Sequence, residues 1–241
     1  LIPLLFLLFS AGIFAQVISS SKWTDLFSYN NVLAVREDNG KLIAATENGV
    51  FFYTPSSGEV TKLSKANGLH EVKISAFDYD ATTKIGLVGY KSGAMDVITP
   101  EGITYVVDIP IASGYTGSKK INHISINGNL AVVSVGYGVS IFRLDKKEFG
   151  DTSFFTNAGL FESAKEAMIK DNFVYVVTAT GLKSHQMNVT FPIYSSWNSV
   201  AGGSFNQIAG TSMVVYANAN TVKYEDGNTF STIAQSFSNI Q

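Results

Sequence analysis

Lysine and tyrosine side chains occur in segments of this sequence that are rich in turn residues. Lys91 precedes a Ser-Gly pair, and Tyr115, Lys119 and Lys120 lie in or beside the glycine-rich stretch 114–118. An aromatic ring can stack on a sugar, and an ammonium group donates charge-assisted hydrogen bonds to carboxylate or phosphate. These four residues therefore form a predicted ligand-binding site, and an anionic glycan suits them. The alternative is that exposed lysines serve solubility alone.

The sequence contains no pattern typical of catalysis or metal binding. His70, His123 and His185 are far apart, and none has a second ligand at the spacing that zinc or iron sites use. There is no Gly-x-Ser-x-Gly nucleophile motif. The stretch 114–119 lacks the adjacent Gly-Lys pair and the following helix of a phosphate loop. We therefore expect no enzyme activity, no cofactor and no bound metal.

A motif that returns every 43 to 45 residues must position these side chains. It consists of an apolar strand, a tight turn and a second apolar strand, and its turn glycines are Gly49, Gly93, Gly138 and Gly181. A fifth copy, over 214–222, keeps the pattern without the glycine. Self-similarity at this period, carried by short strands, is typical of β-propeller blades.

The second repeat shows the expected strand order most clearly. Strands are predicted over 74–78, 85–90, 94–99 and 103–111, separated by Gly, Pro, Asp and Lys turn signals. The two aspartates of 78–80 fit the role of turn formers at a strand end. Four short strands joined by tight turns indicate an antiparallel meander.

We therefore predict an all-β fold, a β-propeller with about five four-stranded blades. The expected blades cover 31–69, 70–112, 119–160, 162–202 and 204–237. The segment 163–170 is taken as the first strand of its blade rather than as a helix. Because an open propeller exposes a blade face and unpaired edges, we expect these blades to be an incomplete ring of a larger, seven-bladed propeller.

Blade geometry brings the predicted binding residues together. In a four-stranded antiparallel blade, the turn between the second and third strands and the connection to the next blade lie at the same end. Loops at one end of a rigid scaffold commonly carry binding sites. Neighbouring repeats are expected to add Lys65, His70 and Lys183 to this end.

The N-terminal residues predict export. The apolar run 1–15 fits the hydrophobic region of a secretory signal with cleavage after Ala15, and it is short for a transmembrane helix. The run begins without Met, so we expect further residues upstream. We assign 16–30 to a lead-in segment and 31–241 to the propeller.

Composition supports an exported domain that does not bind nucleic acid. The sequence has no cysteine, which is typical of bacterial rather than animal secreted modules. Its formal net charge of −2 gives no basic surface for nucleic acid.

Two bacterial families resemble this sequence. The segments 67–69 and 74–80, followed by Gly93, resemble the periplasmic propeller repeats of two-component regulators. A broader likeness, over nearly the whole chain after residue 15, is to the PorZ family of the type IX secretion system of Bacteroidetes. The segments that carry this second resemblance are 23–29, 45–53, 90–93, 120–124 and 137–142.

The PorZ resemblance implies a non-catalytic component of the cell surface, associated with the outer membrane. It implies two propellers followed by a β-sandwich, and an attachment complex with the sortase PorU and with PorV and PorQ. The implied role is to bind anionic lipopolysaccharide and present it to the sortase, which joins it to secreted cargo. The alternatives are a periplasmic sensor propeller of a histidine kinase, and a propeller lyase or glycosidase with carboxylates or a metal at the central channel.

Overall fold

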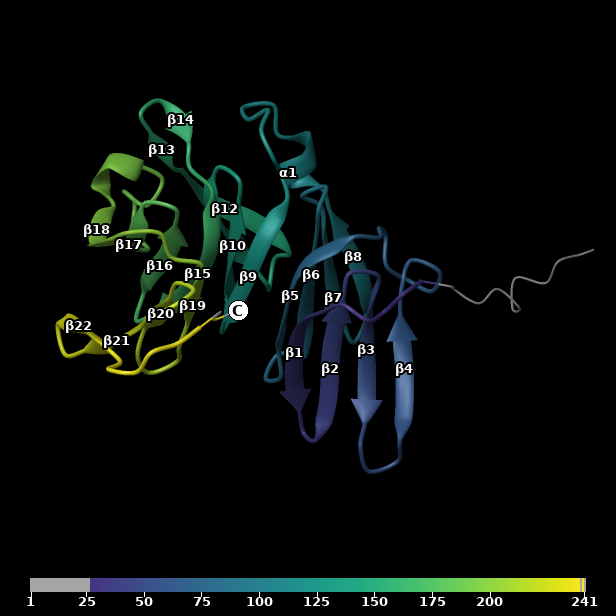
Figure 1. The fold of residues 1–241 in the computed structure, drawn as a ribbon. Coiled ribbons are helices and arrows are strands. Elements are labelled where there is room, and N and C mark those ends of the chain that lie inside the picture. Colours follow the sequence, from purple (N-terminus) through teal and green to yellow (C-terminus); the bar gives the residue numbers. More distant parts are fainter. Residues whose placement is uncertain (1–26, 239, 241) are drawn as a thin grey trace, which may run out of the picture.

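The computed structural model describes residues 27–238 and residue 240, and it contains five four-stranded antiparallel sheets in this part of the chain. The sheets are arranged side by side in chain order, as an arc (Figure 1). Their strands are β1 (Val32–Asp38), β2 (Lys41–Thr46), β3 (Gly49–Thr54) and β4 (Glu59–Leu63); β5 (Ile74–Asp80), β6 (Ile85–Tyr90), β7 (Met95–Thr99) and β8 (Gly102–Val106); β9 (Ile121–Asn127), β10 (Leu130–Val135), β11 (Gly138–Arg143) and β12 (Glu148–Phe154); β15 (Ala164–Lys170), β16 (Phe173–Thr178), β17 (Gly181–Gln186) and β18 (Asn198–Gly202); β19 (Gln207–Ala209), β20 (Val215–Ala217), β21 (Val222–Asp226) and β22 (Thr229–Thr232).

These sheets confirm the predicted all-β propeller with five blades. Each sheet is a meander in which consecutive strands pair, and β15 confirms the strand expected over 163–170. The described residues do not close a ring, as expected of an incomplete propeller (Figure 1). The signal segment 1–15 and most of the lead-in segment lie outside the described residues, whereas Tyr29 packs edge-on against Phe51 at 4.7 Å.

Two connections differ from the predicted strand pattern. The expected strand 103–111 ends at Val106, and a short helix, α1 (Asp108–Ile111), follows it. Pro110 has no N–H for a sheet ladder, and its fixed φ is compatible with the first turn of a helix. A small hairpin, β13 (Thr156–Asn157) and β14 (Leu160–Phe161), was also not predicted.

Strand β10 shows why apolar residues run continuously along the second strand of a repeat. Ala131, Val133 and Val135 belong to the core shared with the second blade, whereas Val132 belongs to the core shared with the fourth. Successive side chains of a strand point to opposite faces of the sheet. Both faces are covered by neighbouring blades, so both sets of side chains are apolar.

Polar side chains link the innermost strands of neighbouring blades. The carboxylate of Asp78 on β5 accepts a hydrogen bond from the N–H of Ile126 on β9 at 2.6 Å. Similarly, Glu166 on β15 accepts one from the N–H of Ile208 on β19 at 2.8 Å. The prediction that Asp78 is a turn former was therefore wrong. Asp80 does form the turn, because its carboxylate accepts hydrogen bonds from the backbone and hydroxyl of Thr83.

Candidate functional site

The predicted binding residues lie at one end of the blades, which we call the loop face. It comprises the turns between second and third strands and the connections between sheets, and it is the upper end of the molecule in Figure 1. In the second blade the turn 91–94 and the connection 107–120 meet here. The backbone carbonyl of Lys119 lies 2.6 Å from where a Cβ atom on Gly93 would stand. Only glycine allows so close an approach, so this turn glycine is explained by packing.

Three of the four predicted residues line one open hollow on the loop face. This lysine hollow has a volume of about 680 Å³, and its walls include Lys91, Ser92, Tyr115 and Lys119. Lys91 and Lys119 come from different loops, which the meander brings to the same end of the sheet. Lys120 is exposed and lies outside the hollow. The binding role of all four residues stays a prediction.

The two lysines of the hollow already have protein partners. The ammonium group of Lys91 forms an ion pair with Glu47 of the first blade, and both side chains are exposed. The ammonium group of Lys119 donates hydrogen bonds of 2.7 Å to the carbonyl oxygens of Pro110 and Ala112. Lys119 therefore fastens the end of α1, and one of its three N–H donors is left for a ligand.

The sequence suggested that the ring of Tyr115 is exposed and can stack on a sugar, but the structure buries it. Its side chain is only 8% exposed, and its ring packs edge-on against Tyr137 at 5.1 Å and Phe161 at 4.8 Å. The exposed aromatic rings of this region are Phe154 and Phe161, which are 42% and 47% exposed. Sequence reasoning missed both, because nothing in the repeat pattern distinguishes an exposed phenylalanine at a strand end from a core residue.

Beneath the lysine hollow lies a smaller apolar cavity of about 140 Å³. Its walls include Ile109, Tyr115, Tyr137, Phe149 and Phe154. Burial raises the pKa of the Tyr137 hydroxyl, so this group stays neutral. The loop face thus presents a cationic hollow above an apolar one.

His70 and Asp96 form a fixed pair beside a second hollow on the loop face. The fully buried carboxylate of Asp96 accepts a hydrogen bond from the backbone N–H of His70 at 2.9 Å and contacts its Nδ1 at 2.7 Å. The imidazole stacks on Tyr105 with ring centres 4.6 Å apart. This hollow, of about 630 Å³, is also lined by Lys65 and Lys91. Lys65 and His70 therefore join Lys91 at the loop face, as blade geometry predicted.

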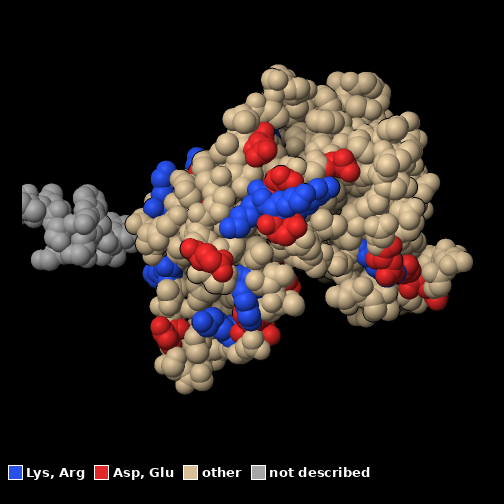
Figure 2. Space-filling view, turned by 180° about the vertical axis from the view of Figure 1, so that it is seen from behind, with Lys and Arg blue, Asp and Glu red and all other residues tan. Residues whose placement is uncertain are grey.

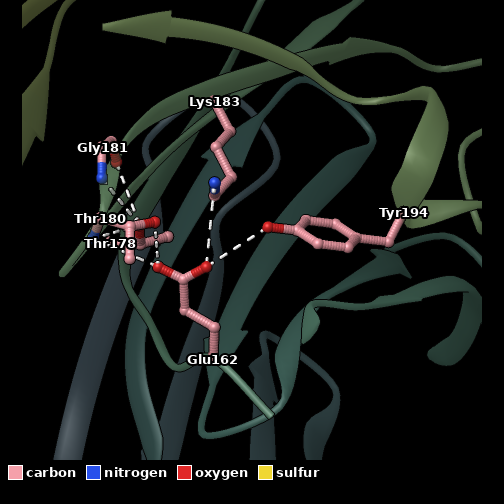
Figure 3. Close-up of polar contacts among 6 residues, drawn as sticks. All are labelled: Glu162, Thr178, Thr180, Gly181, Lys183 and Tyr194. Atoms are coloured by element: carbon pink, nitrogen blue, oxygen red, sulfur yellow. Dashed lines mark hydrogen bonds and ion pairs between the residues drawn. The ribbon is translucent and has the colours of Figure 1, made fainter. Parts of the chain in front are cut away.

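Lys183 is directed inward, to a polar cluster around the buried Glu162 (Figure 3). Its ammonium group lies 3.8 Å from one oxygen of Glu162, and the Thr180 hydroxyl donates a 2.6 Å hydrogen bond to the other. Tyr194 also donates to this carboxylate, at 3.3 Å. Burial opposes ionisation of Glu162, but hydrogen bonds from Thr178 and Thr180 and the charge of Lys183 outweigh it and lower its pKa. The cluster fixes a connection between blades and leaves Lys183 little freedom to bind a ligand.

The described residues contain neither a metal-binding cluster nor a membrane span. No group of three or more His, Asp or Glu side chains among them is arranged to hold a metal ion. Within the same residues, no helix is both long and apolar enough to cross a bilayer. On the back of the molecule, Lys and Arg side chains lie next to Asp and Glu side chains, without a large patch of one sign (Figure 2).

The five meanders, with ligand-sized hollows between their loops, define an incomplete β-propeller. The model of the family described as the N-terminal β-propeller domain of PorZ from the type IX secretion system matches residues 42–198. The chain therefore belongs to the PorZ N-terminal β-propeller family. A comparison with curated proteins finds no match.

Solved structures share this fold at low sequence identity. PorZ of Porphyromonas gingivalis, described as an essential bacterial surface component of the type IX secretion system, is 17% identical with a TM-score of 0.72. The match covers 88% of this chain and 30% of that one. The extracellular domain of BT4673, a hybrid two-component system protein of B. thetaiotaomicron, is 12% identical with a TM-score of 0.59, covering 84% and 34%. The WD40 propeller of Doa1 is 12% identical with a TM-score of 0.60, covering 88% and 71%.

Proposed function

We propose that this protein is a non-catalytic subunit of the type IX secretion system that binds anionic lipopolysaccharide at its loop face. The bound glycan is presented to the sortase, which attaches it to secreted cargo. The observation that carries the proposal is the lysine hollow, where Lys91 and Lys119 meet beside exposed aromatic rings. Membership of the PorZ family supports the secretion context.

The lysine hollow can bind an acidic sugar without rearrangement of the blades. The ion pair of Lys91 with Glu47 is exposed, and such pairs contribute at most about 1 kcal/mol, so a ligand carboxylate or phosphate can replace Glu47. The free N–H of Lys119 and the exposed ammonium group of Lys120 add donors at the rim. The rings of Phe154 and Phe161 supply a surface on which a sugar can stack.

The proposal includes a place in the cell and a set of partners. The protein is exported to the cell surface, associates with the outer membrane, and contacts PorU, PorV and PorQ in an attachment complex. Family membership supports this placement, and the chain matches 30% of the length of the Porphyromonas gingivalis protein. No reaction is assigned to the propeller, because Lys91 and Lys119 serve as hydrogen-bond donors rather than as a nucleophile and a base.

Binding of purified anionic lipopolysaccharide to the full-length protein tests the proposal. Lys91→Gln combined with Lys120→Gln removes two exposed charges and leaves Lys119 to hold α1. If each charge contributes about 1 kcal/mol, the dissociation constant rises roughly 30-fold. Lys146→Gln, an equally exposed lysine at the opposite end of the blades, is the control and leaves affinity unchanged. Equal affinity in wild type and the double variant would show that the ligand does not bind here.

A periplasmic sensor propeller is the second candidate. The fold likeness to the extracellular domain of BT4673 favours it. The sequence of the gene that encodes this protein decides between the two. A transmembrane helix followed by a kinase domain would replace the secretion proposal, whereas a second propeller would support it.

A further inference from the structure

Three large apolar side chains on the loop face are largely exposed. Ile111 at the end of α1 and Leu160 in the β13–β14 hairpin are 74% and 75% exposed, and Phe161 next to Leu160 is 47% exposed. We call these three residues the apolar tip. Soluble proteins rarely cluster large apolar residues at projecting loops without a partner for them.

The hairpin that carries two of the tip residues is packed against a neighbouring loop. The hairpin pairs Thr156 with Phe161 and turns through Ala158 and Gly159, both with positive φ. The buried ring of Tyr115 contacts Phe161 at 4.8 Å, so the hairpin is packed against the loop that follows α1. Figure 1 shows α1 and the hairpin projecting from the same end of the molecule. Tyr115 connects the two parts of the tip, because it lines the lysine hollow with Ile111 and contacts the ring of Phe161.

Charged side chains lie next to the apolar tip: Ile111 lines the lysine hollow together with Lys91 and Lys119, and Asp108 of α1 is also exposed. In Figure 2 the two projections at the top of the molecule carry no Lys, Arg, Asp or Glu on the face shown. The lysines of the loop face lie below them, with Lys91 and Lys119 at the hollow and Lys120 exposed nearby. Apolar side chains beyond a set of lysines match a bilayer interface, where acyl chains lie behind anionic headgroups.

We propose that the apolar tip inserts into the surface of an anionic phospholipid bilayer, with the lysines of the loop face against its headgroups. A projecting point fits lipid better than it fits a protein, because a protein partner would need a matching pocket whereas a bilayer accommodates any short apolar projection. This inference goes beyond the proposed glycan binding and does not require it. Insertion would set the orientation of the propeller, with the loop face toward the membrane.

Flotation of the full-length protein with vesicles tests the proposal. The vesicles contain equal parts of phosphatidylcholine and phosphatidylglycerol and no lipopolysaccharide, so binding to them is independent of the glycan. Ile111→Ser combined with Leu160→Ser removes the two most exposed tip side chains and lowers partitioning roughly 30-fold, given the transfer free energy of such side chains. Val189→Ser is the matched control, because Val189 is 93% exposed on another loop and its loss leaves binding unchanged.

A probe on the tip reports insertion directly. The 241 residues contain no cysteine, so Leu160→Cys adds a single labelling site to this part of the protein. A polarity-sensitive dye at this position shifts to the blue when the vesicles are added, and a dye at Val189→Cys does not. Failure of wild type to float, equal flotation of the double serine variant, or an unshifted dye at position 160 would each overturn the proposal. A tip that binds a protein instead of lipid gives the first of these results.

Discussion

Replacement of Asp96 by alanine is expected to loosen the connection between the first two blades. Asp96 is fully buried, and its carboxylate accepts hydrogen bonds from the backbone N–H of His70 and from the hydroxyl of Tyr90. It also pairs with Nδ1 of His70 at 2.7 Å. Burial, together with the hydrogen bond to Asp96, raises the pKa of Tyr90, so this hydroxyl stays a neutral donor. One carboxylate therefore anchors the segment 64–73, which leads from β4 to β5.

The size of the effect follows from these contacts. A hydrogen bond to a charged group contributes about 1.5–3 kcal/mol, and removal of the carboxylate leaves the buried Tyr90 hydroxyl and the half-buried His70 amide without this acceptor. Because the three contacts share one group, their losses do not add fully, and a cost of about 3–4 kcal/mol for local opening is expected. That cost corresponds to roughly 150- to 700-fold faster amide exchange in the opened segment.

Hydrogen–deuterium exchange of the full-length protein measures this opening, because exchange reports local stability without requiring two-state unfolding. Peptides covering 64–73 are expected to exchange much faster in Asp96→Ala, while peptides of the fourth blade are unchanged. Tyr90→Phe removes one donor to the carboxylate and gives about a tenfold increase, which corresponds to about 1.5 kcal/mol. Asp145→Ala, at an exposed aspartate, is the control. An increase of less than about threefold in Asp96→Ala would refute the reasoning that this carboxylate anchors the connection.

Two further predictions concern the turn glycines and Glu162. Gly138→Ala is expected to cost about 2–4 kcal/mol in the third blade, because its φ is +133° and the added Cβ would lie 2.2 Å from the Ser153 carbonyl oxygen. Gly102→Ala is the control for backbone strain alone, since its φ is +147° with open space around the Cβ. An increase in the exchange of β11 in Gly138→Ala that is no larger than the increase in β8 in Gly102→Ala would contradict this steric argument. The lowered pKa of Glu162 means that its ionised form stabilises the fold at neutral pH, and that this contribution disappears as the pH falls below the ordinary value of 4.5. We expect amide exchange of peptides covering 155–163, corrected for the intrinsic exchange rate, to rise in the wild type as the pH falls. In Glu162→Gln this exchange depends less on pH. Identical pH profiles of the two proteins would be inconsistent with this role of Glu162.

The strands of the propeller were predictable because their pattern is local. Both faces of β6, β10 and β16 are covered by neighbouring blades, so their sequences are nearly continuous apolar runs. Turns that contain glycine mark the ends of these runs. Helix α1 was missed because the apolar and β-branched residues of 103–111 favour a strand over the whole segment. Only Pro110 indicates that the strand ends before it and a helix follows. The β13–β14 hairpin was missed because each of its strands has two residues, too few for a period to be visible.

The candidate site was only partly predictable. Lys91 and Lys119 were placed correctly at one end of the blade, because antiparallel strands fix which turns share an end. The burial of Tyr115 and the exposure of Phe161 were not predictable, because they depend on a contact between the loop after α1 and a hairpin in the next connection between blades. Lys183 was expected on the loop face, but the buried Glu162 holds it inside the fold.

The sequence by itself determined the repeat, the number of blades and the end of each blade at which loops gather. Its turn glycines at 49, 93, 138 and 181 mark the same point of four successive sheets. Only the tertiary structure shows why glycine is needed: at Gly138 and Gly181 a carbonyl oxygen of the fourth strand lies 2.2 and 2.3 Å from where a Cβ would stand. The structure also decided how blades are joined, as in the hydrogen bond from Ile126 to Asp78, 48 residues apart. Strand periodicity is a property of neighbouring residues, whereas these contacts exist only after whole sheets have packed.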